Sequence, residues 1–314
     1  MADENIQVLK TFTLESLPDL DVVVMGALEL FEHTPAPRID VSAYKRPLVV
    51  GSGNAEATGR IVFRATDAVF ASESDYEDKL RAIPEIDGVV VLSASGGKHA
   101  PGIVRTARAM GKRVTLLTNT PNSLASKELD TAGGDRAYIF PKNREPYTYN
   151  TSTYMGMILG STGESAGEIK RYIDQGIATM QFPDFSHHDK FFVVVPPRLG
   201  SIKRMLQVKF IELFGRIVAR DVETSEYMTH AVTVVPSDEL FINIGVEKST
   251  WGTPEQNLYV PLPPDADYGA IMAIGYYVIG QIQKAHPPYF KDNIVTYCET
   301  AGKAFGTTIS PIVE

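Results

Sequence analysis

The sequence predicts an α/β protein with two doubly wound, parallel-sheet domains, and two observations support this fold class. Short apolar runs of strand length alternate along the chain with longer segments of helical periodicity. The short runs are rich in Val, Ile, Leu and Phe without strict alternation of polar residues, which is typical of strands covered on both faces. Repeated strand–helix units imply right-handed crossovers, and these crossovers build parallel sheets.

The first half of the chain contains a series of strand-like runs separated by helical segments. The predicted strands are PLVVGSG (47–53), DAVFAS (67–72), GVVVLSAS (88–95), KRVTLLTN (112–119) and RAYIFP (136–141). Between the third and fourth of these runs lies the segment 99–111, in which Ile103, Ala107 and Met110 recur at helical spacing.

A polar stretch, GSTGESAGE (160–168), interrupts this pattern near the middle of the chain. Because Gly and Ser lower local order, the stretch predicts a first domain over 1–164, which includes an N-terminal helix, and a second over 165–314. The second half opens again with a strand, a glycine turn and a helix, which suggests a duplicated unit. Its predicted elements are strands at 191–197, 241–247 and 258–263, a helix from about 201 to 214 and a buried helix at 270–283.

The composition limits the compartment and the class of protein. Of the 314 residues, 44% are hydrophobic and 22% charged, as in ordinary globular proteins. No apolar run approaches the roughly 20 residues that a membrane span needs, and the acidic N-terminus lacks a secretion pattern. Cys298 is the only cysteine, which excludes an intramolecular disulfide and a thiolate zinc cluster. These features predict a cytoplasmic protein without a membrane partner.

The charge pattern limits the possible ligands. The net charge is −8 and no block of Lys or Arg occurs, so we expect no nucleic acid partner. A small phosphorylated substrate is compatible with this charge, because phosphate pockets use hydroxyls and backbone N–H groups. His187, His188 and Asp189 are adjacent and lack a spaced partner, so we expect no metal site. We also expect no cofactor.

The loop GSGNAEATG (51–59) follows the carboxyl end of the first predicted strand, where open parallel sheets bind ligands. Gly51 and Gly53 permit a tight turn whose N–H groups could meet an anion, although the glycines could equally serve the turn alone. A dinucleotide site is an alternative, because Glu73 lies 22 residues beyond Gly51, where a ribose-binding acid would be. Glu56 in place of the third glycine disfavours that alternative, since a carboxylate repels a pyrophosphate.

A second loop, LSASGGKHAPG (92–102), gives a stronger indication of anion binding. Ser93 and Ser95 straddle a strand end, and Gly96, Gly97 and Lys98 follow just before a helix. Two hydroxyls and a cation at a helix N-terminus suit a phosphate dianion. A plain helix cap by Ser95 with a solvated lysine is the alternative, but the clustering favours phosphate.

These loops resemble those of the sugar isomerase (SIS) domain family, which has GxGxS and SxSGxT loops, then an asparagine near a strand end with a following SxLA. The chain has GSGNA (51–55), SASGGK (93–98) and TNTPNSLAS (118–126) in the same order. The segment 149–160, YNTSTYMGMILG, is similar to the family's helix with a Ser–Thr pair. The likeness covers essentially the whole chain and is strongest to paired isomerase domains of the glucosamine-6-phosphate synthase type.

The resemblance implies two flavodoxin-like domains and a phosphorylated sugar as ligand. Two positions depart from the family pattern: Ala55 stands where the first loop usually has serine, and Lys98 where the second loop has threonine. In the family both positions normally supply hydroxyls to the phosphate, and here Lys98 would supply a full charge instead. The substrate-binding residues implied are Gly53, Asn54, Ser93, Ser95, Lys98, Ser152 and Lys209.

The segment 205–234 carries the residues that suggest catalysis. Lys209 and Glu212 share one face of a predicted helix whose other positions are apolar. A partly desolvated carboxylate there would have a raised pKa and could shuttle protons, although an exposed ion pair is the alternative. Glu226 and His230 follow in ETSEYMTH.

The resemblance assigns roles to these residues, because the family has K-x-x-E on a helix followed by E-x-x-H. It implies that Glu212 moves a proton between carbons one and two of an opened sugar and that His230, one residue further along than usual, assists ring opening. In the family this histidine often comes from a neighbouring subunit, so a homodimer is expected. Lys303 is the candidate for the family's C-terminal lysine, with Lys291 as its competitor.

The predicted function is a sugar-phosphate aldose–ketose isomerase or an amino-sugar-phosphate deaminase that works through an enediol or enolamine. A deglycase for phosphorylated sugar–amino acid adducts is a close alternative. A non-catalytic sugar-phosphate-binding regulator is a further alternative, disfavoured because a sensor needs neither Glu212 nor His230.

Overall fold

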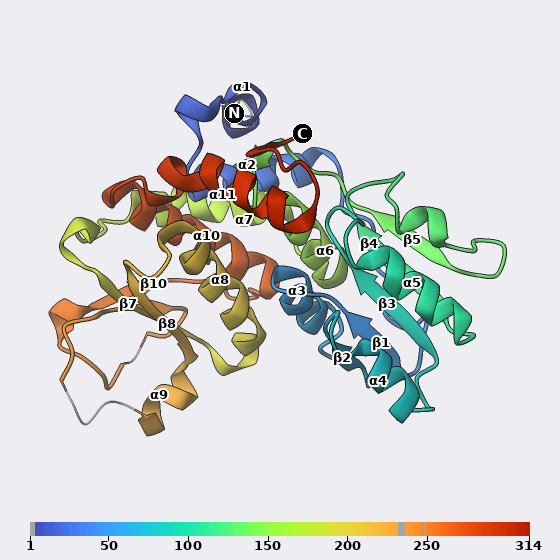
Figure 1. The fold of residues 1–314 in the computed structure, drawn as a ribbon. Coiled ribbons are helices and arrows are strands. Elements are labelled where there is room, and N and C mark those ends of the chain that lie inside the picture. Colours follow the sequence, from blue (N-terminus) through green and yellow to red (C-terminus); the bar gives the residue numbers. More distant parts are fainter. Residues whose placement is uncertain (1–3, 232–235, 248) are drawn as a thin grey trace. The chain divides into compact units, whose positions relative to one another are not determined.

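The computed structural model describes residues 4–231, 236–247 and 249–314, and the chain divides into two compact units (Figure 1). Unit 2 comprises Thr34–Lys142 and Thr153–Gly163. Unit 1 comprises the residues up to His33, Asn143–Ser152 and Glu164–Glu314. Each unit contains one parallel sheet flanked by helices, and the predicted α/β fold class with parallel sheets is confirmed.

The sheet of unit 2 has the strand order β2-β1-β3-β4-β5, and all of its neighbouring strands are parallel. This is the flavodoxin-like order, in which ligands bind beside the carboxyl ends of the first and third strands. The strands are β1 (Pro47–Val50), β2 (Val69–Ala71), β3 (Gly88–Leu92), β4 (Arg113–Thr118) and β5 (Arg136–Ile139). The helices are α3 (Asn54–Val62), α4 (Tyr76–Ala82), α5 (Ala100–Ala109) and the short η2 (Ser126–Glu128). Helix α6 (Thr151–Thr162) has its first two residues in unit 1 and the rest in unit 2.

Alternate strand residues face opposite sides of this sheet. Leu48, Val50 and Val91 belong to a buried cluster with α4 and α5. Val49 and Leu92, one position away, point to the other face, where they contact Gly59 of α3. Both faces are covered, which explains why the strands read as continuous apolar runs.

The sheet of unit 1 has the order β10-β9-β7-β8, again with parallel neighbours. Read across the sheet, β10, β9, β7 and β8 occupy the positions that β4, β3, β1 and β2 occupy in unit 2. The strands are β7 (Lys190–Val195), β8 (Ala219–Thr224), β9 (Leu240–Ile244) and β10 (Asn257–Val260). A separate antiparallel pair joins β6 (Glu145–Pro146) to β11 (Ile312–Val313).

The helices of unit 1 cover its sheet unequally. Phe191 of β7 packs against Phe210 of α8 (Lys203–Phe214) on one face, with ring centroids 6.0 Å apart. On the other face, Val194 and Phe241 pack with Met228 of α9 (Ser225–Ala231) and with Trp251. The other helices of this unit are α1 (Glu4–Thr11), α2 (Leu20–His33), α7 (Ala166–Gln175), α10 (Tyr268–Ala285) and α11 (Tyr289–Phe305).

The chain passes from one unit to the other between residues 163 and 164, one residue before the predicted boundary, but the residues up to His33 and Asn143–Ser152 group with the second half. Residues up to His33 group with the second half because α2 packs along α10 and α7. The Leu20 N–H donates to Gln283 Oε1 at 2.9 Å, and Asp21 pairs with Lys284. The predicted break at 160–168 is a short connection between the end of α6 and the start of α7.

The predicted buried helix at 270–283 is confirmed as the central part of α10. Helix α10 contacts α2, α7 and α8, so most of its circumference is buried. This burial explains why its residues are apolar on nearly all sides. Among the helices of the described ranges, none combines the length and apolarity that crossing a membrane requires.

Candidate active site

Lys209 lies at the centre of a buried polar network in unit 1. Its side chain is 0% exposed because the neighbouring positions of α8 form the apolar core. Its Nζ donates to the carbonyl oxygens of Thr148 and Tyr149, at 3.2 and 2.7 Å, and to Glu212 Oε2 at 2.7 Å. An ammonium has three hydrogens to donate, and these three acceptors match them. Lys209 is therefore placed to hold protein groups rather than to contact a ligand.

Glu212 is the part of this network that faces a cavity. Its side chain is 20% exposed and lines a cavity of about 390 Å³ between the end of α8, α11 and Thr148. Burial raises the pKa of Glu212, and the Lys209 ammonium opposes that rise. Lys209 binds Oε2, so Oε1 is the oxygen placed to accept a proton. A carboxylate with a raised pKa at the wall of a cavity can act as a proton shuttle.

The backbone beside Glu212 is strained. Thr148 has a φ of 77° and Asn150 a φ of 44°, a region that a β-branched residue such as threonine rarely enters. The Thr148 and Tyr149 carbonyls are bound by Lys209, as described above. On the other side, the buried Glu145 accepts the Thr151 and Ser152 N–H groups at 2.6 and 2.8 Å. Such strain persists only where surrounding contacts impose it, and it concentrates at functional sites.

Glu145 and Thr148 were not identified from the sequence. Burial raises the pKa of Glu145, while its hydrogen bonds to Ser152 and Thr151 oppose that rise. No sequence motif marks Thr148, and the only local signal is Asn150, a residue type that tolerates positive φ.

Ser152, predicted to bind substrate, is buried in unit 1. Its Oγ accepts the Asn143 N–H at 3.0 Å, and its own N–H is bound to Glu145. These contacts secure the first turn of α6, so the serine has a structural explanation that requires no ligand.

The remaining catalytic candidates of unit 1 lie apart from the cavity lining described above. His230 is exposed in the last turn of α9. Lys303 is exposed near the end of α11, six residues and about 9 Å along the helix beyond the lining residue Tyr297. Lys291, the competing lysine, forms a 2.8 Å ion pair with Asp19. Within one chain, Lys209 and Glu212 lie together, whereas His230, Lys303 and Lys291 are not among the residues that line the Glu212 cavity.

The first loop of unit 2 begins α3 with the expected tight turn. Gly53 has a φ of 56° and immediately precedes the helix. Asn54 is buried, and its Oδ1 has no hydrogen-bond partner among the described residues. Ala55, where the resemblance expects a serine, is also buried.

The second loop has its hydroxyls arranged around backbone N–H groups. Ser93 Oγ accepts the Gly96 N–H at 3.1 Å, and Ser95 Oγ accepts the Gly97 N–H at 3.3 Å. Each hydroxyl keeps its own hydrogen for donation to a ligand. Lys98 follows with a φ of 48°. Ser93, Ser95 and Lys98 line a pocket of about 90 Å³, enough for an anion of a few heavy atoms.

The segment 118–126, which begins at the end of β4 and is called the third loop here, forms hydrogen bonds to the backbone of the second loop. The carbonyl of Ala94 accepts the Asn119 N–H at 2.9 Å and the Thr118 hydroxyl at 2.8 Å. A side chain at Gly96 would come within 2.3 Å of Ser123 Oγ, so only glycine fits there. Asn119 of the third loop also donates a hydrogen bond from Nδ2 to Thr153 Oγ1 of α6, at 2.7 Å.

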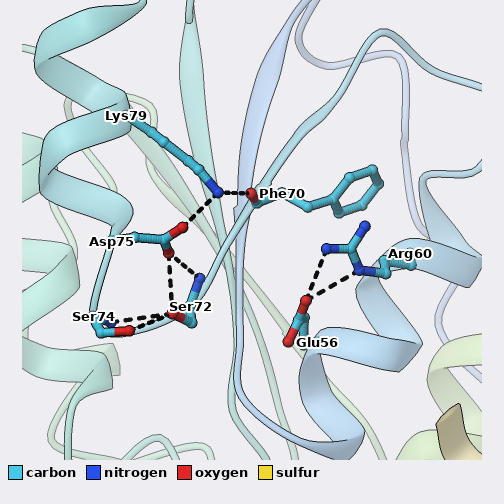
Figure 2. Close-up of polar contacts among 7 residues, drawn as sticks. All are labelled: Glu56, Arg60, Phe70, Ser72, Ser74, Asp75 and Lys79. Carbon is cyan, nitrogen blue, oxygen red and sulfur yellow. Dashed lines mark hydrogen bonds and ion pairs between the residues drawn. The ribbon is translucent and has the colours of Figure 1, made fainter.

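Glu73 completes the wall of the 90 Å³ pocket from the end of β2. Figure 2 shows how its loop is fixed: Asp75 accepts from the Ser72 N–H at 2.7 Å and from Lys79 Nζ at 2.6 Å. The Lys79 and Ser72 hydrogen bonds lower the pKa of Asp75 to about 2. In the same view Glu56 binds Arg60 at 2.8 Å, so this acid is directed along α3.

Across the described ranges, no group of three or more His, Cys, Asp or Glu side chains is arranged to hold a metal ion. The adjacent His187, His188 and Asp189 are thus not part of such a group. His187 instead lies 3.7 Å from Asp184 within one turn of chain.

The chain resembles solved structures of sugar-phosphate proteins. A glucosamine-6-phosphate deaminase from Thermotoga maritima matches with a TM-score of 0.58 at 14% identity, over 87% of this chain and 97% of the other. The C-terminal domain of glucosamine-fructose-6-phosphate aminotransferase from Francisella tularensis matches with a TM-score of 0.55 at 13% identity, over 90% and 95% of the two chains. No protein-family model and no curated protein matches the sequence. At these identities the likeness shows the fold alone, and this chain shares its parallel α/β fold with these solved structures.

Proposed function

We propose that this protein is a sugar-phosphate enzyme of the aldose–ketose isomerase or amino-sugar-phosphate deaminase type. The observation that carries the proposal is the Glu212 carboxylate, which has a raised pKa, is held by Lys209 and lines a cavity of about 390 Å³. Both reactions need one base that moves a proton between adjacent carbons, and a single positioned carboxylate meets that need.

In the proposed mechanism, Glu212 removes a proton from the carbon next to the carbonyl of the open-chain sugar. The bonding pair forms a carbon–carbon double bond while the carbonyl oxygen gains a proton, which gives an enediol, or an enolamine when nitrogen replaces the oxygen. The same carboxyl group then returns its proton to the former carbonyl carbon while the hydroxyl on the other carbon loses its proton and becomes the new carbonyl. In a deaminase an imine forms in place of that carbonyl, and water replaces its nitrogen, which leaves as ammonia. Lys209 keeps Oε2 engaged, so that Oε1 takes and returns the proton.

Phosphate recognition is assigned to the second loop of unit 2. Ser93 and Ser95 would donate their hydroxyls, and Lys98 would add a charge where the family pattern has a threonine. Charge-assisted hydrogen bonds of this kind are stronger than neutral ones. Gly53 and Asn54 are assigned a supporting role at the first loop, where the buried Asn54 Oδ1 lacks a partner among the described residues.

The proposal retains His230 as the group that assists ring opening, supplied by a second copy of the chain. His230 is exposed on α9 and lies outside the lining of its own Glu212 cavity, which is compatible with action in trans. Lys303 is retained only as a secondary candidate, since its exposed position near the end of α11 gives it no contact with Glu212.

The test is a thermal-shift screen of aldose, ketose and amino-sugar phosphates, followed by product analysis of each hit in deuterated water. A proton shuttled by a carboxylate exchanges with solvent, so the expected product carries deuterium on carbon one or two. Hits that bind tightly but give no product at any enzyme concentration would instead make the protein a binding regulator.

A further inference from the structure

A third pocket lies in unit 1, on the face of its sheet opposite to α8. Phe192 of β7 and Phe241 of β9 are register partners and lie on this face, because the neighbouring Phe191 packs against Phe210 of α8 on the other. The pocket has a volume of about 250 Å³, and its described lining shares no residue with that of the Glu212 cavity. It lies near the amino ends of β7, β9 and β10, whereas open parallel sheets bind their substrates at the carboxyl ends. The pocket is therefore separate from the site of the proposed proton transfer.

Aromatic rings form one wall of this pocket. The ring centroids of Phe192 and Phe241 are 5.9 Å apart, and Trp251 packs with Phe241 in the same buried cluster. The indole Nε1–H of Trp251 donates to Asn243 Oδ1 at 3.0 Å, so the polar edge of the indole already has its partner. What the three residues offer to a ligand is therefore aromatic carbon, whose π faces carry partial negative charge.

Two asparagines and a glycine hold Trp251 in place. Besides accepting from the indole, Asn243 donates from Nδ2 to Asn257 Oδ1 at 2.8 Å, and Asn257 donates to the Trp251 carbonyl at 2.9 Å. Gly252 follows with a φ of 63°, and a Cβ there would lie 2.8 Å from the Phe241 ring. The loop thus lies too close to the sheet for a larger residue, and the aromatic wall is fixed before a ligand arrives. Such preorganisation lowers the entropic cost of binding.

The other polar residues of the lining are largely bound to one another. Thr253 and Gln256 form a capping box, in which Gln256 Oε1 accepts the Thr253 N–H at 3.0 Å and the Thr253 side chain accepts the Gln256 N–H. Gln256 Nε2 donates to the Ser237 carbonyl at 2.7 Å, and Ser237 Oγ accepts the Glu239 N–H at 3.2 Å. These contacts leave the carboxylate of Glu239 as the main polar group that can meet a ligand.

The charge beside the aromatic wall is negative. Glu239 is the one charged residue of the described lining, and no ion pair joins it to a basic residue in the part of the chain that the structure describes. Lys190, whose charge reaches Glu239, is bound to Asp238 instead, at 2.6 Å. Burial raises the pKa of Glu239 and the charges of Asp221 and Asp238 add to that rise, while a hydrogen bond from Ser237 and the charge of Lys190 oppose it. A cation in the pocket would favour the ionised carboxylate.

We propose that this pocket binds a small organic cation of the alkylated ammonium class, with its alkyl groups against the aromatic wall and its charge beside Glu239. An alkylated ammonium is attracted to aromatic faces and needs few hydrogen-bond acceptors around it. An anion would be repelled by Glu239, and a hard metal ion needs oxygen ligands that an aromatic wall does not supply. The site is independent of the proposed sugar-phosphate chemistry and adds a second ligand to it.

The experiment uses the fluorescence of Trp251, which is the only tryptophan of the chain and therefore reports on this pocket. Choline is the cationic probe, and 3,3-dimethyl-1-butanol, in which a carbon replaces the nitrogen, is its neutral counterpart of the same shape. Both are titrated into the whole chain at constant ionic strength. We expect choline to change the emission in a saturable manner and the neutral alcohol to bind about tenfold more weakly, because several rings attract the cation.

Three variants separate the parts of the site. Glu239→Gln keeps the shape and removes the charge, so choline should bind about fivefold more weakly while the neutral alcohol is unaffected. Phe192→Leu keeps apolar bulk and removes one ring, which should weaken choline binding about threefold. Glu255→Gln is the matched control, because Glu255 is exposed between Thr253 and Gln256 but lies outside the lining, and it should retain the wild-type affinity. Cooperative thermal unfolding checks that each variant is folded.

Four results would overturn the inference. Equal affinity for choline and the neutral alcohol would make the site a plain apolar pocket, and wild-type affinity in Glu239→Gln would remove the carboxylate from it. A ligand-free emission that shifts on dilution, without any response to choline, would show that a second copy of the chain fills the pocket. Absence of any response to choline or to dilution rejects the site altogether. None of these results depends on turnover of a sugar phosphate, so the proposed function is tested separately.

Discussion

The Lys209 ammonium lies 2.7 Å from Glu212 Oε2 and also binds the Thr148 and Tyr149 carbonyls at 3.2 and 2.7 Å. One buried cation thus orients the carboxylate and fixes the strained backbone that forms part of the same cavity wall. The arrangement explains why a charge is retained in the core: each of its hydrogens has an acceptor, which offsets the desolvation cost.

Replacing Glu212 by glutamine should reduce turnover by about 100- to 10,000-fold, the usual contribution of a positioned proton-transfer group. Substrate affinity should be preserved, because glutamine keeps the shape and the hydrogen-bonding capacity. The measurements are steady-state kinetics and binding calorimetry, with Glu299→Gln, exposed on α11, as the control. Near-normal turnover on the true substrate would remove Glu212 from the mechanism.

Replacing Lys209 by glutamine should shift the pH dependence of activity. The ammonium opposes the rise that burial causes in the Glu212 pKa, so its loss raises that pKa further. The ionised, basic form then appears only at higher pH, and the acidic limb of the kcat/KM profile moves upward. Loss of the buried pair should also cost about 3–5 kcal/mol of unfolding free energy.

The control for that variant is Lys203→Gln on the same helix. Lys203 pairs with Glu223 at 2.7 Å but is partly exposed, so its loss should cost about 1 kcal/mol or less. An unchanged acidic limb in Lys209→Gln, with the protein folded, would separate Lys209 from the ionisation of Glu212.

Ser95→Ala and Lys98→Ala should each weaken sugar-phosphate binding by about 1.5–3 kcal/mol, as expected for a hydrogen bond to a charged group. Both residues line the 90 Å³ pocket of unit 2. Isothermal titration with substrate and with inorganic phosphate measures the effect. If both variants bind like the wild type, the phosphate is held elsewhere.

Gly96→Ala should be more destabilising than Gly111→Ala, although both glycines have positive φ, at 60° and 70°. At Gly111 an added Cβ meets nothing within 4 Å, so only the backbone cost of about 1–2 kcal/mol applies. At Gly96 the Cβ lies 2.3 Å from Ser123 Oγ, which adds roughly 1–3 kcal/mol of overpacking. Urea unfolding of both variants compares them; equal costs would mean that the Ser123 loop moves aside freely.

Mixing inactive Glu212→Gln and His230→Ala proteins should restore part of the activity after subunit exchange, because we expect the histidine to act from a neighbouring copy. Sedimentation should show a homodimer for the wild type. Verified exchange without any recovery of activity would rule out action of His230 in trans.

The sequence by itself determined the strands and the loops at their ends. Buried parallel strands need apolar side chains on both faces, which gave runs such as 88–92 their continuous Val and Leu. The hydroxyl residues Ser93 and Ser95 directly follow the end of β3, so their position in the sequence is enough to place them at the wall of the pocket. The pairing of Lys209 with Glu212 was likewise readable from their spacing of three on a helix.

Only the tertiary structure decided what surrounds these residues. The Lys209 ammonium is bound by the carbonyls of Thr148 and Tyr149, which lie some sixty residues away in sequence. Glu145 and Thr148 have no motif. Glu145 accepts the N–H groups of Thr151 and Ser152, and Thr148 has an unusual backbone conformation whose carbonyl is bound by the distant Lys209. The N-terminal α2 joined the second half of the chain through its packing on α10, a contact between residues more than two hundred positions apart. Periodicity records which side of an element is buried, whereas the identity of its partner depends on chain topology that no local pattern encodes.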